Sequence, residues 1–247
     1  MIAKSCILQH KSIGEVEVPR LMLGTSPFIG AGQFGSRSMK YHLRFARDPK
    51  NVKELIVEAA KIGITWVQVL GYEFLVNAVE DARNITKMDI QVIGSIGESD
   101  FHRQFGLMKR LDTKIILTHG IVTDRLDNRF EDYIYRINEV AIAGAVTHHP
   151  GKTVSSLSDY DKVKIIMVPI NKKGKFMSPS PQKSLEAIRN TDKVLIGKKT
   201  LAAGDLKPKE ALEYVADFVY GVTIGIASSE ELKETFTIAK EIWNTNE

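Results

Sequence analysis

Three features of this 247-residue sequence predict an α/β fold and, within that class, a (β/α)8 TIM barrel. Short runs of apolar and β-branched residues alternate with amphipathic stretches, at spacings of about 25–35 residues. Most of the short runs are apolar throughout, which is typical of parallel strands that are covered on both faces. The length suits one barrel of about 200–250 residues, so we expect a single barrel domain over residues 1–247.

The elements follow one another as eight strand–helix units. Helix starts are marked by capping residues or by a proline at the first position, as at Asp127 and Pro208. Before the first unit, Ser5–Gln9 and Glu15–Val18 flank Ser12-Ile13-Gly14, which predicts an N-terminal β-hairpin that covers one end of the barrel. The predicted strands are Arg20–Leu23, Thr65–Val69, Ile90–Ile93, Lys114–Leu117, Val140–Ala143, Lys164–Val168, Val194–Ile196 and Val222–Ile224.

The composition excludes several classes of protein. A single cysteine, Cys6, excludes a disulfide scaffold and a cysteine-based metal site, and we expect Cys6 to be a small buried apolar residue. No run of about 18 apolar residues is present, and the first 20 residues lack the apolar core of a signal peptide. We therefore expect a cytoplasmic protein with no membrane partner. The net charge of +4 comes from 34 basic residues interspersed with 30 acidic ones, a pattern that argues against a nucleic-acid partner.

Active sites of such barrels lie at the C-terminal ends of the strands. The long segment Gly24–Arg47 follows the first strand and carries several glycines together with Arg37 and other basic residues. Segments of this length are usually functional, so we expect a lid over an anionic ligand, with a solvated surface loop as the alternative.

Three of the six histidines, His119, His148 and His149, follow predicted strands. Histidine titrates near neutral pH, so His119 can donate or accept a proton there. Tyr72 is a candidate acid, or else a packing residue with its hydroxyl bonded to the backbone. These histidines, with Asp124 and Glu73, also form a candidate ligand set for a divalent metal such as zinc, manganese or iron.

The last strand leads directly into a helix at Ser228-Ser229. Backbone amides at a helix N-terminus bind anions, and the preceding Gly225 would let the backbone approach a phosphate. The same serines, followed by two glutamates, also form an ordinary capping box, and both interpretations can hold together.

The last third of the chain resembles the aldo-keto reductases, in Lys198–Leu212 and Val222–Leu232. Val168–Asn171 and Leu117–His119 resemble segments of the same family. This resemblance implies carbonyl reduction with NADP or NAD as cofactor, held by Lys198, Gly204, Gly225, Ser228 and Ser229. We also expect a small, phosphorylated or otherwise anionic substrate, held by Gln68, His148, Asn171 and Arg37.

The catalytic Asp, Tyr, Lys and His of that family do not all carry over. Gln68 stands at the Asp position, and Glu73 stands at the Tyr position with Tyr72 one place short. Ser95 lies near the Lys position, and His119 matches the His. In this reading His119 orients the carbonyl and Tyr72 protonates it, with Glu73 beside them.

Three other functions remain open. The first is a metal-assisted hydrolase, lyase or isomerase that uses the histidines and carboxylates. The second is Schiff-base chemistry by Lys172, Lys198 or Lys199, where strand alternation predicts that only one of the last two faces inward. The third is a non-catalytic ligand-binding barrel.

Apolar residues of the last helix suggest where a second copy could bind. Phe236, Ile238 and Trp243 form a candidate contact of a homo-oligomer, with the barrel core as the alternative location.

Overall fold

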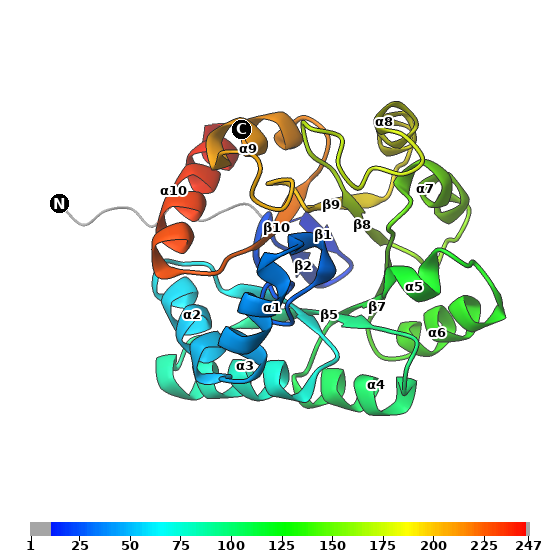
Figure 1. Ribbon diagram of the computed structural model, residues 1–247. Helices are drawn as coiled ribbons and strands as arrows, with labels where there is room; N and C mark the ends of the chain where they lie inside the picture. The colour runs from blue at the N-terminus through cyan, green and yellow to red at the C-terminus, as the bar shows by residue number, and fades with distance from the viewer. Residues whose placement is uncertain (1–10, 246–247) are drawn as a thin grey trace.

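The computed structural model describes residues 11–245. Eight parallel strands close into a barrel in the order β10-β3-β4-β5-β6-β7-β8-β9, with helices arranged around it (Figure 1). This confirms the predicted (β/α)8 fold. The barrel strands are β3 (Leu21–Gly24), β4 (Trp66–Leu70), β5 (Gln91–Ile96), β6 (Ile115–Thr118), β7 (Ile142–Val146), β8 (Ile165–Pro169), β9 (Val194–Lys198) and β10 (Gly221–Gly225).

The helices begin where the sequence supplies caps. Asp127 accepts hydrogen bonds from the amides of Arg129 and Phe130, and Ser180 accepts one from Lys183. Pro150 and Pro208 occupy first helical positions, where no amide hydrogen is needed. The helices that follow the strands are α2 (Lys50–Lys61), α3 (Glu73–Thr86), α4 (Phe101–Arg110), α5 (Gly120–Thr123), α6 (Asn128–Asn138), α7 (Pro150–Ser158), α8 (Pro181–Arg189), α9 (Pro208–Ala216) and α10 (Ser229–Thr245).

Two apolar clusters hold the barrel together. One fills its interior and includes Met22, Ile93 and Met167, while the larger one lies between the strands and the helices. Full burial of each such side chain contributes about 1.5–3 kcal/mol. Phe236 and Trp243 of α10 are fully buried in the larger cluster, which confirms the core interpretation and leaves these two side chains unavailable for a subunit contact.

The N-terminal hairpin pairs β1 (Lys11–Ile13) with β2 (Val16–Val18), antiparallel. Gly14 makes the turn with φ of 59°, a left-handed conformation that glycine adopts readily. The hairpin packs on the interior cluster and so covers one end of the barrel, as predicted. The predicted turn was placed too early, because Ser12 and Ile13 belong to β1; Ser5–Gln9 and Cys6 lie outside the described residues.

The segment between β3 and α2 is not the irregular loop that its glycines predict. It folds into a 3-10 turn η1 (Gly32–Phe34), a short helix α1 (Arg37–Tyr41) and a π-helical turn η2 (His42–Ala46). Phe28 and Phe45 are fully buried with ring centroids 4.9 Å apart, and α1 lies across the centre of the ring of helices (Figure 1). An aromatic contact thus anchors this segment over the barrel mouth.

No helix within residues 11–245 is long and apolar enough to cross a lipid bilayer.

Candidate active site

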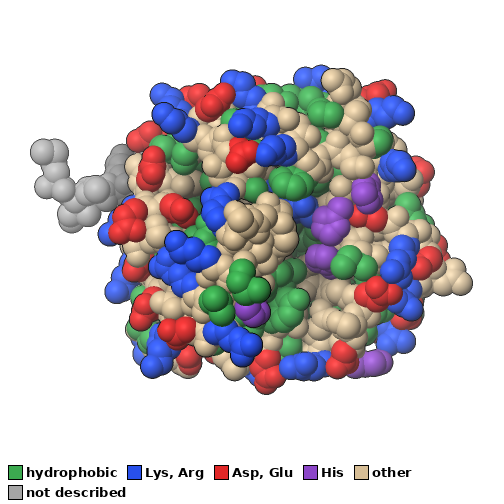
Figure 2. Space-filling model, viewed as in Figure 1, with side chains coloured by type: hydrophobic (Ala, Val, Ile, Leu, Met, Phe, Trp, Pro, Cys, Tyr) green, Lys and Arg blue, Asp and Glu red, His purple; other side chains and the backbone are tan. Residues whose placement is uncertain are grey.

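A cavity of about 310 Å³ opens at the C-terminal end of the barrel, beneath the segment that carries α1. Its wall is formed by strand-end residues, among them Gln68, Ser95, His119, His148 and Lys198. Figure 2 shows histidine side chains gathered beside a hollow in this face. The volume lies at the lower end of the range for ligand pockets, roughly 300–1,000 Å³, so it suits a small metabolite.

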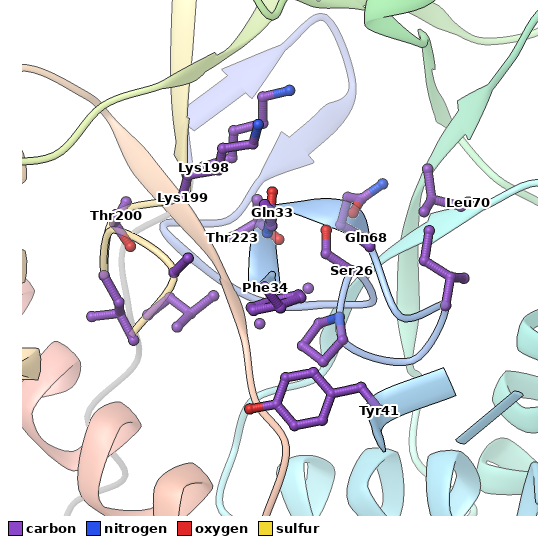
Figure 3. A pocket seen from close by; sticks show the side chains of 18 of the residues that line it. Ser26, Gln33, Phe34, Tyr41, Gln68, Leu70, Lys198, Lys199, Thr200 and Thr223 are labelled. Carbon is purple, nitrogen blue, oxygen red and sulfur yellow. The ribbon is translucent and has the colours of Figure 1, made fainter. Parts of the chain in front are cut away.

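Two consecutive lysines at the end of β9 both line this cavity, and their side chains extend side by side (Figure 3). Strand alternation predicted that only one would face inward, and that prediction was wrong. The reason is that β9 ends at Lys198, while Lys199 has φ of 57°. This left-handed conformation is uncommon for a non-glycine residue. It redirects the second side chain to the same side as the first.

The two lysines share one electrostatic environment. Burial holds the pKa of Lys198 well below its usual range, the Lys199 charge lowers it further, and Asp124 acts in the opposite direction. Burial also lowers the pKa of Lys199. The Lys199 Nζ lies 4.4 Å from the centroid of the Phe176 ring, a contact that favours a cation. Of the pair, Lys198 is therefore the amine more readily deprotonated.

His119 caps the short helix α5. Its Nδ1 accepts a hydrogen bond of 3.3 Å from the Ile121 amide. The proton of the neutral ring therefore resides on Nε2. Burial, followed by the charge of Lys198, lowers the pKa of His119 to about 4, against an opposing effect of Asp124.

His148 lies beside His119, with ring centroids 5.2 Å apart. Burial lowers its pKa to about 3, and the charge of Lys198 is the next largest cause. Gly120 packs directly against this ring, since a Cβ there would lie 2.7 Å from the His148 Nδ1. At neutral pH the cavity therefore holds two uncharged imidazoles in a fixed arrangement.

Asp124 supports this pair without lining the cavity. Its carboxylate accepts hydrogen bonds from the hydroxyls of Thr147 and Thr153 and one of 2.8 Å from the His148 amide. These bonds fix the loop after β7, so Asp124 positions His148.

Several hydroxyls in the cavity wall have no partner. Within residues 11–245, the side-chain oxygens of Ser95, Thr200 and Thr223 are buried and make no hydrogen bond. Each unpaired buried group costs about 1–3 kcal/mol, so three at one cavity indicate a surface prepared for a polar ligand. Thr200 and Thr223 were missed by the sequence analysis; the detectable signal was a polar residue in or beside an apolar strand.

The segment above the cavity contacts the loop after β9. The Arg37 guanidinium donates a hydrogen bond to the Ala203 carbonyl and packs on Gly204. Arg37 also lines the cavity, so it lies where the lid hypothesis requires a cation. Closure of this segment stays a prediction.

Other predicted site residues lie outside the cavity wall. Tyr72 is half-exposed at the start of α3, and the exposed Glu73 forms a 2.9 Å ion pair with Arg103. His149 is exposed at the start of α7. Asn171 is buried and holds a turn, donating 2.8 Å to the Lys175 carbonyl.

The predicted anion site at the start of α10 is a reciprocal capping box. The Glu231 amide donates to the Ser228 hydroxyl at 3.2 Å, and the Glu231 carboxylate accepts from the Ala227 amide at 2.9 Å. Ser228 and Ser229 do not line the cavity, whereas Gly225 and Glu231 do. The Glu231 carboxylate thus already engages the Ala227 amide, one backbone donor at the start of this helix.

The predicted metal ligands lie only partly together. His119, His148 and Asp124 are neighbours, with the His148 Nδ1 3.9 Å from an Asp124 oxygen. Residues 11–245 contain no group of three or more His, Cys, Asp or Glu side chains arranged to hold a metal ion. The metal hypothesis therefore lacks a ligand set in this part of the chain.

Comparison with known proteins supports the fold. No protein-family model matches the sequence, and no curated protein matches it. Among solved structures, a putative aldo-keto reductase from Pseudomonas aeruginosa is 19% identical with a TM-score of 0.67, covering 94% of both chains. A putative 2,5-diketo-D-gluconic acid reductase B is 15% identical with a TM-score of 0.67, covering 95% of this chain and 86% of the other.

An aldo-keto reductase from Brucella melitensis has a TM-score of 0.61 at 14% identity, covering 93% of this chain and 95% of the other. The chain therefore shares the barrel fold of aldo-keto reductases, as the resemblance predicted. Identities this low establish the fold alone.

Proposed function

We propose that this chain is an enzyme that acts on a small carbonyl compound bearing a carboxylate or a phosphate, in the cavity at the C-terminal end of the barrel. The observation that supports it most is that Lys198, Lys199 and Arg37 surround the same 310 Å³ cavity as two neutral imidazoles. The charged side chains of Arg37 and Lys199 attract an anionic group, while the imidazoles suit proton transfer and carbonyl polarisation.

Each imidazole has a role in this proposal. The His119 Nε2 carries the ring proton and donates a hydrogen bond to the carbonyl oxygen. Some enzymes use a neutral histidine in this way to polarise a carbonyl. His148 is unprotonated at neutral pH, so its ring accepts a proton from the carbon next to the carbonyl. The unpaired hydroxyls of Ser95 and Thr223 orient the ligand.

Reduction of the carbonyl by NADPH is the second candidate, and the shared fold favours it. At the start of α10, the Ala227 amide already donates to the Glu231 carboxylate, and Ser228 and Ser229 do not line the cavity, which weighs against the predicted cofactor contacts. Gln68 and Ser95 stand where the resemblance expects the catalytic Asp and Lys.

Thermal unfolding with small ligands tests the main proposal. Pyruvate and dihydroxyacetone phosphate should raise Tm, because a ligand at 100 times its Kd stabilises by about 2.7 kcal/mol. Lactate, which has the anion but no ketone, and acetone, which has the ketone but no anion, should have smaller effects. Equal Tm shifts with lactate and pyruvate would contradict the proposal. So would the absence of a Tm shift with both pyruvate and dihydroxyacetone phosphate.

Two controls define the site and the cofactor. Arg37→Met should weaken the response to pyruvate, whereas Arg136→Met should leave it unchanged, because Arg136 forms an exposed pair with Asp132. Calorimetry with NADPH addresses the second candidate. If NADPH binds and is oxidised when pyruvate or dihydroxyacetone phosphate is added, the enzyme is a reductase. If NADPH fails to bind at millimolar concentration, reduction by NADPH is excluded.

A further inference from the structure

We infer that Lys198 is a covalent nucleophile, whose Nζ forms a Schiff base with the carbonyl carbon of the ligand in this cavity. The inference rests on the proposed function, because it concerns the same ligand. It reassigns Lys198 from the cofactor-binding role that the resemblance implies. It also names the reaction class: chemistry at the carbon next to the carbonyl, namely proton exchange, carbon–carbon bond cleavage or bond formation.

The position of Lys198 makes its amine available. The residue ends β9 at the mouth of the barrel, and its side chain lines the cavity rather than the outer surface (Figure 3). Within residues 11–245, its Nζ makes no ion pair or hydrogen bond that would hold it as an ammonium ion. A carboxylate that could do so, Asp124, is instead bonded to Thr147, Thr153 and the His148 amide.

The other candidate lysines make contacts that favour their charged form. The Lys172 Nζ forms a 2.9 Å ion pair with Glu210 on the surface, and its side chain is 52% exposed. The Lys199 Nζ lies over the Phe176 ring, which stabilises its charge. The charge of Lys199 beside Lys198 lowers the pKa of Lys198. A buried lysine next to a second cation is the arrangement that favours a neutral, nucleophilic amine.

The charge state of Lys198 agrees with this geometry. Burial and the neighbouring Lys199 hold the pKa of Lys198 well below its usual range. The neutral, nucleophilic form of this amine is therefore more accessible than that of an exposed lysine, which is almost entirely charged near neutral pH.

The step balances without an oxidant or a reductant. The Nζ lone pair attacks the carbonyl carbon, forming a C–N bond, while the carbonyl π pair moves to oxygen. That oxygen accepts a hydrogen bond from the His119 Nε2 and takes up the proton that Nζ loses. Protonation of the resulting hydroxyl by a solvent proton then expels water and leaves an iminium ion. The iminium draws electrons from the adjacent carbon, whose proton passes to His148.

Reductive trapping tests the inference on the full-length wild-type protein. Pyruvate and dihydroxyacetone phosphate are the probes, each mixed with the protein and sodium borohydride at pH 7. Borohydride reduces an iminium ion to a stable secondary amine, which peptide mass spectrometry locates. We expect one reduced adduct per chain, on Lys198. Adducts on Lys199, or adducts distributed over surface lysines, would overturn the inference.

Variants sharpen the result. Lys198→Arg keeps the charge but removes the nucleophile, and should lower adduct yield by about ten-fold or more. Lys172→Arg is the matched control and should label like the wild type. Lys199→Met removes the neighbouring charge and should move the pH profile of Lys198 labelling upward. Because the wild-type adduct is located directly, misfolding of a variant would not leave the inference untested.

The two proposals fail in different ways. If pyruvate raises Tm but borohydride traps nothing on Lys198, the Schiff base is excluded and the carbonyl-binding function remains. If neither pyruvate nor dihydroxyacetone phosphate binds and no adduct forms, both proposals are wrong.

Discussion

The two sides of the barrel mouth differ sharply in the chemistry of their side chains. The ends of β6, β7 and β9 bring together His119, His148 and Lys198, all with lowered pKa values. The ends of β4 and β5 place an uncharged amide, Gln68, and an uncharged hydroxyl, Ser95, in the same cavity wall. The titratable groups that can do acid–base or nucleophilic work lie on the first side.

This difference explains how a shared fold can carry different chemistry. The resemblance to aldo-keto reductases assigns an Asp and a Lys to β4 and β5, where this chain has Gln68 and Ser95. On the opposite side, Lys198 and Lys199 place two adjacent amines beside two imidazoles. We expect the reaction to depend on β6, β7 and β9, because strand ends supply catalytic residues independently of one another in this fold.

The largest expected effect is the drop in stability when Asp124 loses its carboxylate, which positions His148 at the end of β7. Asp124→Asn replaces one acceptor oxygen with an amide that faces the hydroxyls of Thr147 and Thr153. Leaving such partners unsatisfied should lower the free energy of unfolding by about 3 kcal/mol. Urea unfolding followed by circular dichroism measures it. Asp112→Asn, at an exposed ion pair with Lys114, should cost less than about 1 kcal/mol, and equal losses would contradict the role of Asp124.

The pH dependence of stability follows from the two imidazoles. Their pKa values in the folded protein, about 4 for His119 and about 3 for His148, lie below the unfolded value of about 6.5. The unfolded chain therefore binds more protons as pH falls below about 6.5, and stability falls with it, until each group is protonated in the folded state. After allowance for solvent screening, we expect a loss on the order of 1–2 kcal/mol per imidazole between pH 7 and pH 4.

Nuclear magnetic resonance titration checks the same point directly. The ring protons of His119 and His148 should not shift until the pH is below about 5, and His119→Gln should reduce the pH dependence of the urea midpoint. Titration of either ring near pH 6.5 would show that burial does not lower the pKa of that histidine.

Much of the fold was predictable because it is encoded in local patterns. Apolar β-branched runs such as Ile165–Pro169 mark parallel strands wherever they occur. The prediction was least accurate at β7, placed at Val140–Ala143 and found at Ile142–Val146. The reason is that Ala143, Gly144 and Ala145 carry no β-branched signal, and Val140 is exposed.

The site was predictable only in part, for a different physical reason. Strand-end position correctly brought His119, His148 and Lys198 to the cavity. It failed for Tyr72, and strand alternation failed for Lys199, because beyond the strand end the direction of a side chain depends on backbone dihedral angles that spacing does not encode.

A smaller change in stability distinguishes buried hydroxyls without a hydrogen-bond partner from buried hydroxyls that stabilise the fold through one. Thr223→Val removes a buried hydroxyl that has no partner in the described residues, and should stabilise the protein by about 1 kcal/mol while weakening pyruvate binding. Thr118→Val is the matched variant, since the Thr118 hydroxyl bonds that of Thr123 at 2.7 Å, and it should be destabilising. Urea midpoints with and without pyruvate give both values; the same sign for the two variants would contradict the distinction.

The smallest expected effect is on the β4 side, at the residue that the resemblance makes a catalytic acid. Tyr72 is 50% exposed and does not line the cavity, so Tyr72→Phe should change stability by less than about 0.5 kcal/mol. Binding and trapping of pyruvate should stay within about two-fold, since the variant removes a hydroxyl that meets no ligand. A loss as large as that of Lys198→Arg would mean that the β4–α3 loop rearranges to bring Tyr72 into the cavity. Residues on both sides of the barrel mouth would then take part in the reaction. The difference between the β4–β5 side and the β6, β7 and β9 side would then apply only to the ligand-free protein.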